Sequence, residues 1–502
     1  MSPVIDTGQT SWQNKHETYV QTLRRVLQAV NEPPQTGDPL QRYNRMTGTL
    51  QTLIGRALGE NVRLRAFGGG WSFSGAPSTD GYLLDTSPLN LWFKIRDRSI
   101  HPGYAGDRAG LYFLQCGNSI AGLNRNLRTE GRSLRTTGAS NGQSIVGAMS
   151  TGTHGSAIDL GAVQDYVVGI HLIVAPDRHL WIERSSSPVT TDGFAGLLGA
   201  ELRRDDELFD AVLVGLGAFG LIHGVMIETD PIFLFEMHRV RLPLDDRLRR
   251  AITTLDFTGA GLPGGDERPR HFDVVINPYD LDDGVYVTVM YQRPFRPDYP
   301  VPVRGDLAPG DDALQLVGTV TDALPLLIPG VMKAAVRSQY RTTSTPLQGT
   351  TNDIFPTTTT RGRASGCAIA VPLARALDTM ELALSINRDH GPFPCLVALR
   401  FVPRTQALLG FTRFEPTCIV DVDGTLSNRT RSFYSRIWQS LSTSDIPYGM
   451  HWGKLLGLSA AEVRRLYGGN LDRWLAVRRQ LLPAPLRRAF SNRFLEELDL
   501  AS

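Results

Sequence analysis

Two glycine-rich segments contain the residues best suited to hold a phosphorylated ligand. Residues 134–161 read LRTTGASNGQSIVGAMSTGTHGSAIDLG, and residues 65–75 read RAFGGGWSFSG. Glycine lets backbone N–H groups approach a ligand closely, and serine and threonine add short hydrogen-bond donors. Consecutive backbone amides in such turns can neutralise two phosphates without any lysine. The two segments therefore predict the walls of a site for a large phosphorylated cofactor.

Charged side chains suited to act on a bound substrate lie in three short segments of the carboxyl-terminal half. They read ALR at residues 398–400, VDVDG at 420–424 and YGMHWGK at 448–454. A fixed cation can stabilise negative charge that develops in a reaction, and an ammonium group can also hold a substrate hydroxyl. Asp421 and Asp423 share one face of a strand because side chains alternate with a period of two. Two alternatives stay open: these carboxylates form a turn at a strand end, and Lys454 lies at the surface beside a core tryptophan.

Hydrophobic periodicity predicts the elements that position these segments in the amino-terminal half. Residues 62–67 alternate as a strand and run straight into the first glycine segment. Helices are predicted in 17–58, which is polar and helix-compatible, and at 120–130. Further strands are predicted at 82–84, 111–115, 167–174 and 180–183, followed by a glycine-punctuated apolar stretch at 208–227. This mixture predicts an α+β cofactor domain with a boundary near residue 231.

Strand-like alternation interleaved with helices continues beyond that boundary. Strands are predicted at 239–242, 272–276, 285–291, 367–371, 395–402 and 417–422, and helices at 313–340, kinked at Pro325 and Pro329, and at 373–387. The proline-rich stretch 293–311 is interpreted as a semi-rigid loop, either a lid or a crossing segment. The predicted organisation is a cofactor domain at 1–230, a mixed α/β substrate (cap) domain at 231–445, and a mostly helical segment at 446–502 that packs back on the cofactor domain.

Length, charge and cysteine content limit the classes of function. A chain of 502 residues exceeds what one core usually supports, so two or three domains are expected. The formal net charge is +2, with acids and bases interspersed, which argues against nucleic acid or a membrane surface as the main partner. The four cysteines lack metal-ligand spacing, so neither a disulfide framework nor a metal site is expected. The amino-terminal residues contain no apolar leader, and a cytoplasmic protein is expected; the oligomeric state stays open.

The first glycine segment does not complete a Rossmann motif. Gly68 and Gly70 supply the first half of GxGxxG, but Phe73 stands where the third glycine belongs. The pattern instead resembles the p-cresol methylhydroxylase-type FAD domain of the vanillyl-alcohol-oxidase superfamily, most closely its alditol oxidase and sugar-1,4-lactone oxidase branch. The resemblance covers about residues 17–230 and 395–456. It implies a two-subdomain FAD-binding domain, a cap domain and a carboxyl-terminal segment that returns to the flavin.

The resemblance also implies which residues contact the cofactor. The first glycine segment matches the loop that holds the FAD pyrophosphate, the second matches the wall beside the flavin, and HWGK matches a family signature whose histidine contacts the flavin. The implied FAD-binding residues are Ala66, Phe67, Gly68, Gly69, Gly70, Trp71, Ser72, Gly138, Ala139, Ser144, Gly147, Thr151, Gly152, Thr153, His154, Gly155, Ile222 and His451.

One departure from the family concerns the bond between protein and flavin. Many relatives have a histidine that bonds covalently to the flavin in a GxxHS pattern, where this chain has Trp71 before Ser72. An indole cannot replace that imidazole, so FAD is predicted to be held without a covalent bond, with Trp71 packed on the loop. His154 has the option of acting as a base, but within TGTHG it is expected to orient the backbone through a hydrogen bond.

A second departure concerns the substrate residues. The resemblance assigns Lys454 to substrate contact and matches Arg400 to the arginine of a Glu-x-Arg motif, whose glutamate is Ala398 here. We hypothesise that Asp421 or Asp423 replaces that glutamate as the partner of Arg400. The same segment, CIVDVDGTL, also matches the opening motif of haloacid-dehalogenase-type phosphatases. That match is interpreted as coincidental, because few residues follow it and they are predicted to be mostly helical.

The predicted function is that of an FAD-dependent oxidoreductase acting on a CH–OH group of a small polyol, sugar or lactone-like substrate. Gly138 favours dioxygen as acceptor, giving hydrogen peroxide, because a small residue at the matching position is associated in the superfamily with access of dioxygen to the flavin. The alternatives are a dehydrogenase that uses another acceptor, a specialised oxidase of secondary metabolism, and a flavin-binding protein without turnover.

Overall fold

The first glycine segment begins where a short parallel strand ends. The computed structural model describes residues 3–302, 324–355 and 364–502. Its first sheet has four strands in the order β1 (Val4–Asp6), β4 (Arg25–Ala29), β6 (Tyr82–Asp85) and β5 (Leu64–Phe67). Helix α1 (Pro39–Gly59) packs beside it through a buried apolar face, and Asp38 caps that helix by accepting hydrogen bonds from two backbone amides.

The second glycine segment is held above a six-stranded sheet. The strand order is β12 (Glu201–Arg204), β11 (Arg178–Glu183), β10 (Val167–Ala175), β13 (Leu221–Glu228), β8 (Leu111–Gln115) and β7 (Trp92–Lys94). Helix α2 (Ile120–Thr129) precedes the segment, and α3 (Ile145–Thr151) lies within it. Ser144 caps α3 at its start, and Gly152 ends it with a positive φ of 81°, a conformation that glycine adopts at no steric cost. The two sheets and these helices form the cofactor half.

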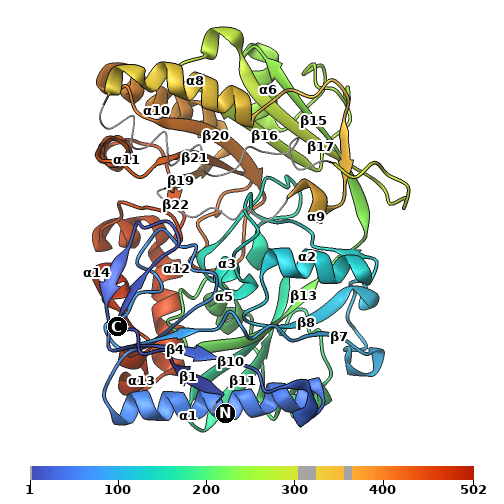
Figure 1. Ribbon diagram of the computed structural model, residues 1–502, viewed down its shortest axis with the longest axis vertical. Helices are drawn as coiled ribbons and strands as arrows, with labels where there is room; N and C mark the ends of the chain where they lie inside the picture. The colour runs from blue at the N-terminus through green and yellow to red at the C-terminus, as the bar shows by residue number, and fades with distance from the viewer. Residues whose placement is uncertain (1–2, 303–323, 356–363) are drawn as a thin grey trace.

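The cap half is built on one antiparallel sheet of eight strands. Their order is β18 (Leu347–Gly349), β15 (Phe233–Leu242), β17 (Val285–Pro294), β16 (His271–Ile276), β20 (Cys395–Val402), β21 (Thr417–Thr425), β19 (Ala364–Pro372) and β22 (Gly449–Met450). Helices α6 (Asp246–Thr254) and α10 (Ala376–His390) pack on one face. Helix α8 (Ile328–Gln339) packs on part of the other face. Figure 1 shows these three helices at the end of the molecule opposite α1.

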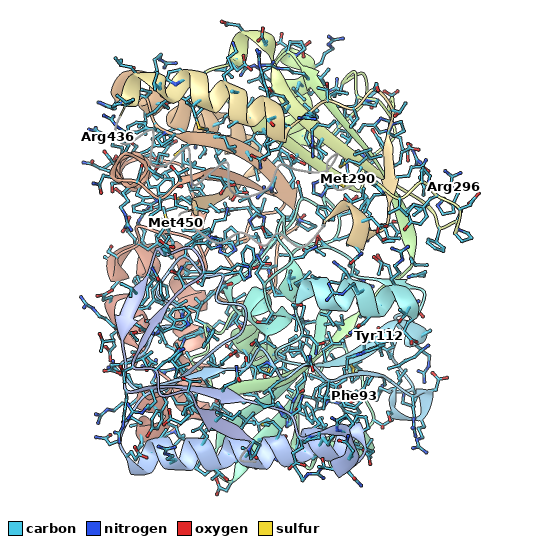
Figure 2. The ribbon with its side chains drawn as sticks, in the orientation of Figure 1. Phe93, Tyr112, Met290, Arg296, Arg436 and Met450 are labelled. Carbon is cyan, nitrogen blue, oxygen red and sulfur yellow. The ribbon has the colours of Figure 1, made fainter. Side chains whose placement is uncertain are left out.

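The carboxyl-terminal residues join the two halves. Helix α11 (Asn428–Thr443) stays beside α10, whereas β22 extends the cap sheet, and Figure 2 shows Met450 of β22 where the halves meet. Beyond it, α12 (Ala460–Leu481) contacts α5 (Asp206–Leu213), and α13 (Ala484–Ala489) contacts α1. The chain then ends with α14 (Arg493–Glu497), so the last segment packs on the cofactor half. Within the described ranges, no helix combines the length and the apolar character needed to cross a membrane.

One expectation about secondary structure needs correction, and a second is tested only in part. Strands β3 (Val20–Thr22) and β4 replace the start of the helix expected from residue 17, because β4 pairs into the first sheet and is largely buried there. The helix expected at 313–340 is described only in part: a short turn at Pro325–Leu327 leads into α8, with Pro329 in its first turn. Residues 303–323, which include much of the proline-rich loop, lie outside the described residues.

A chain of buried histidines runs through the core of the cofactor half. Tyr43 on α1 is hydrogen bonded to Nδ1 of His171, and His171 Nε2 lies 2.8 Å from His179. The Tyr43 ring also stacks on His223 at 3.9 Å, and His223 is held by Thr47 and Gln115. Burial lowers the pKa of His223 to about 3 and holds the pKa of His171 well below its ordinary value. Both imidazoles are therefore neutral in the folded protein near pH 7.

We expect these histidines to make the protein acid-sensitive. Histidine in an unfolded chain titrates near pH 6.5. Below that pH, His171 and His223 bind protons in the unfolded chain but not in the folded protein. The stabilisation that depends on neutral His171 and His223 is therefore fully present above about pH 6.5. Below that pH, each of the two imidazoles lowers the free energy of unfolding by about 1.4 kcal/mol per pH unit, down to its pKa in the folded protein. Urea unfolding at pH 7 and 5 should show a smaller pH dependence for His223→Gln than for the wild type. The exposed His390→Gln serves as the control, and equal pH dependence in all three proteins would contradict the prediction.

Candidate active site

A cavity of about 480 Å³ lies between the two halves and collects most of the residues singled out by their sequence. Its wall includes both glycine segments, the HWGK segment and part of the cap sheet. Among the predicted residues, those that line it are Ala66, Phe67, Gly68, Gly69, Gly70, Trp71, Ser72, Gly138, Ala139, Ser144, Gly147, Thr151, Thr153, His154, Ile222, Arg400, Asp423, His451 and Lys454. Gly152, Gly155 and Asp421 are not part of the lining; Gly152 ends α3 behind the wall, and Gly155 packs against the backbone of Thr137.

The two glycine segments touch each other, and only glycine permits that contact. A Cβ added to Gly68 would overlap the side chain of Ser144, and one added to Gly69 would lie 2.5 Å from the carbonyl oxygen of Gly142. The indole of Trp71 packs into the space that Gly69 and Gly142 leave open, so Trp71 is a packing residue of the loop as predicted. The result is a cradle of backbone groups, which suits a phosphate-bearing cofactor.

A buried cation in this wall also fits a polyanionic cofactor. The Arg65 side chain lines the cavity and donates hydrogen bonds to the carbonyl oxygens of Ala76, Leu216, Gly217 and Phe490. Among the described residues, no carboxylate pairs with it. Burial, together with the charge of Arg478, lowers the pKa of Arg65 to about 9. An unpaired buried charge is costly, so a pyrophosphate in the cavity would supply the negative charge that the protein lacks here.

Two buried histidines in the wall are fixed in opposite tautomers. His451 Nδ1 accepts a hydrogen bond from the Gly453 amide at 2.9 Å, so a neutral His451 carries its proton on Nε2. His154 Nδ1 lies 3.0 Å from the carbonyl oxygen of Gly155, so it donates, and Nε2 of His154 is an acceptor. Burial lowers the pKa of His154 to about 4 and holds the pKa of His451 well below its ordinary value. His154 thus makes the backbone hydrogen bond expected of it, and His451 presents a fixed donor.

A cluster of opposite charges forms the cap end of the cavity. The carboxylate of Asp421 is fully buried and lies 2.5 Å from both Arg400 Nη1 and Lys454 Nζ. Lys454 Nζ also lies 3.1 Å from Asp423, whose side chain is 36% exposed. Burial opposes ionisation of Asp421, but the charges of Arg400 and Lys454 outweigh it and hold the pKa of Asp421 below its usual range. The same pairing raises the pKa of Lys454 against the effect of burial, so Asp421, Arg400 and Lys454 are charged at neutral pH.

Strand register explains why these side chains meet. In the β20–β21 pair Ala398 stands opposite Asp421, and Arg400 lies one pleat further along the same face. The small side chain of Ala398 leaves the diagonal between Arg400 and Asp421 free. On the other side of β21, Gly366 stands opposite Asp423, and a Cβ there would lie 2.7 Å from Asp423 Oδ1. Both pairings of β21 are antiparallel, which excludes the parallel arrangement that the phosphatase reading required.

Sequence reasoning missed part of this site. Arg65 is the first residue of the first glycine segment, and no role was predicted for it. Its neighbours in the sequence do not indicate that its charge is buried and unpaired. Part of the cap wall was also missed. Tyr340 lines the cavity after the end of α8, with its pKa raised to about 12 by burial, and no motif marks it. The other unpredicted cap residues in the lining are Met332, Gln339, Ala364, Ser365, Pro394, Leu396 and Gly424.

We expect the flavin to be released when the protein is denatured. Trp71 offers no nucleophilic nitrogen, and burial raises the pKa of Cys116, which also lines the cavity, to about 12, so its thiol is not a thiolate. After acid precipitation the yellow colour should appear in the supernatant, measured by its absorbance and fluorescence. Colour that stays in the washed pellet would contradict the prediction.

Comparisons with known proteins agree with this geometry. A family model for an FAD binding domain matches residues 45–182, and one for D-arabinono-1,4-lactone oxidase matches residues 270–498. L-Gulono-1,4-lactone dehydrogenase from Mycobacterium tuberculosis is 24% identical over 86% of this chain and 90% of its own length. D-Arabinono-1,4-lactone oxidase from Debaryomyces hansenii is 24% identical over 47% of this chain and 37% of its own. The structure of a cholesterol oxidase from Brevibacterium sterolicum has a TM-score of 0.67 at 14% identity, covering 99% of this chain and 97% of that one.

These matches confirm the predicted fold class and FAD as the cofactor. The FAD-binding match contains both glycine segments, and the lactone-oxidase match contains Arg400, both aspartates, His451 and Lys454. The cholesterol oxidase likeness extends over the whole chain and supports the shared architecture. The chain is therefore similar in sequence and fold to the sugar-lactone oxidases of the vanillyl-alcohol-oxidase superfamily, and it is an FAD-dependent oxidoreductase that acts on CH–OH donors.

Proposed function

We propose that the protein oxidises a CH–OH group of a sugar 1,4-lactone or a closely related polyol, with dioxygen as acceptor and hydrogen peroxide as product. The observation that carries the proposal is the charge cluster of Arg400, Asp421, Asp423 and Lys454 at the cap end of a glycine-walled cavity. The names of the relatives support a lactone as the substrate, since those relatives are lactone dehydrogenases and oxidases.

Some residues of the site would hold the cofactor, and others would hold the substrate. The backbone amides of the glycine segments and the charge of Arg65 would hold the pyrophosphate of FAD. Bound FAD supplies the acceptor of the hydride. Lys454 and Arg400 would donate hydrogen bonds to the substrate hydroxyls, and Nε2–H of His451 adds a donor in the same wall. Asp423, which faces the cavity, can accept a hydrogen bond from the substrate hydroxyl and orient it.

The choice of dioxygen depends on Gly138. This residue lines the cavity, and a Cβ there would lie 2.9 Å from Thr153 Cγ2, so a side chain would crowd the wall at this point. Because glycine places no side chain at this point of the wall, it supports access to the cavity by a small acceptor. The Mycobacterium tuberculosis relative is named a dehydrogenase, which keeps a different acceptor as the second candidate.

Flavin reduction tests the proposal directly. The purified yellow protein would be mixed anaerobically with L-gulono-1,4-lactone, D-arabinono-1,4-lactone or a polyol, and bleaching of the flavin followed by absorbance. Aerated buffer should then restore the colour with one peroxide formed for each dioxygen consumed. A flavin that no compound of the panel reduces would reject the proposed activity. Reduction without reoxidation by dioxygen would reject only the acceptor and favour the dehydrogenase.

A further inference from the structure

Both cations at the substrate end of the cavity are already matched by carboxylates of the protein. Asp421 bridges Arg400 and Lys454 from a fully buried position, and Asp423 approaches Lys454 from the cavity side. Arg400 and Lys454 are each only 16% exposed, so neither can swing out toward solvent to meet another anion. The cluster therefore offers an incoming substrate little uncompensated positive charge.

The negative groups are also placed unequally with respect to the cavity. Asp421 lies behind the lining, whereas Asp423 forms part of it. A further carboxylate, Asp273, stands opposite Arg400 in the neighbouring strand pair and lies 3.1 Å from His271. A substrate carboxylate near Lys454 would thus come close to Asp423, and like charges in a poorly solvated site repel strongly.

The packing of β19 and β21 fixes Asp423 in this place. Gly366 lies opposite it, and a Cβ at Gly366 would be 2.7 Å from Asp423 Oδ1 and 3.4 Å from Lys454 Nζ. The pair of side chains therefore fills the room that a side chain on β19 would take. Asp423 is held at the wall by its contact with Lys454 and by the strand that carries it.

We infer that Asp423 is a specificity-determining residue that restricts the substrate to alcohols without a carboxylate. Its carboxylate accepts hydrogen bonds from hydroxyl, amide or ammonium groups and repels acids. Neutral lactones, polyols and amides enter the site, whereas open-chain sugar acids are rejected. The inference rests on the proposed function, because it names the charge class of the substrate for that same site.

A matched pair of ligands tests the charge alone. L-Gulonamide and L-gulonate have nearly the same shape, and only the second is charged at pH 7.5. Their Kd values would be measured on the FAD-loaded protein from perturbation of the flavin spectrum, and flavin reduction would be followed in the same samples. We expect gulonate to bind at least 10-fold more weakly than gulonamide. In Asp423→Asn this ratio should fall at least fivefold, because the repelling charge is gone.

The control variant is Asp389→Asn, which removes a carboxylate at the exposed end of α10 and should leave the ratio unchanged. Asp423→Asn is expected to fold, because Asp421 still pairs with both cations. Equal affinities in the wild type, or a ratio unchanged in Asp423→Asn, would overturn the inference even where flavin is reduced. A preference for the amide without flavin reduction by any neutral compound would uphold the inference while rejecting the proposed oxidation, and failure of both ligands and the lactones to bind would overturn both.

Discussion

Replacing Asp421 with alanine should lower the free energy of unfolding by about 3–5 kcal/mol and reduce flavin reduction by about 100-fold or more. Asp421 is the fully buried partner of both Arg400 and Lys454, so its removal leaves two neighbouring cations without their shared counter-charge. Their mutual repulsion would destabilise the fold and displace Lys454 from the reacting carbon. Urea unfolding and anaerobic stopped-flow reduction of the flavin measure the two effects.

Further variants separate the effect of the Asp421 charge from the effect of its side-chain shape, and the role of Asp421 from that of Asp423. Asp421→Asn keeps the shape of the side chain but loses its charge, so it should resemble Asp421→Ala in stability. Asp423→Ala should fold normally, because Asp423 is partly exposed and Asp421 remains. Asp421 acts through the two cations and is therefore a positioning residue. Turnover that stays intact in both Asp421→Ala and Asp423→Ala would contradict the role given to this pair.

Local patterns in the sequence predicted many of the elements around the site. The strand predicted at 111–115 is β8, and the strand predicted at 395–402 is β20. The helix predicted at 120–130 is α2 within one residue. The two strands were predictable as short runs of apolar residues, because nearly every residue in them is buried. Helix α2 was predictable because one face is buried, which leaves a period of 3.6 in its sequence. The glycine segments were readable because close backbone approach restricts their residue types.

The pairing of strands that lie far apart in the chain could not be predicted from these local patterns. The alternation of residues predicted that Asp421 and Asp423 share a face, but only the register of β21 against β20 and β19 shows that Asp421 is buried and Asp423 lines the cavity. Residues 25–29 read RVLQA, and their apolar residues fit a helix as well as a strand, yet β4 is held between β1 and β6. Tertiary partners decided both cases, and a single sequence does not name those partners.

The role of Arg65 could not be predicted for the same reason, because it depends on tertiary partners. Its neighbours in sequence are the start of a glycine loop, whereas its hydrogen-bond partners come from the loop before β13 and from the end of α13. Arg65 thus connects the cofactor cavity with the carboxyl-terminal helices. The segment that carries His451 and Lys454 is anchored to the cap sheet through β22, to the first glycine segment through Ser74, and to α12 through the stacked rings of Trp452 and Tyr467.

Replacing Lys454 with methionine should slow flavin reduction by about 100- to 1,000-fold while FAD stays bound. The substitution removes the one ammonium group in the cavity wall, as far as the described residues show, but leaves Asp421 paired with Arg400, so the fold and the glycine cradle should be retained. Lys454→Arg tests geometry as well as charge: the planar guanidinium cannot occupy the compact place between Asp421 and Asp423, so recovery should be only partial. The reduction rate at saturating substrate, the flavin content and the thermal unfolding midpoint would be measured for each variant. A methionine variant that reduces its flavin at the wild-type rate would show that the cation at this position does not contribute to hydride transfer.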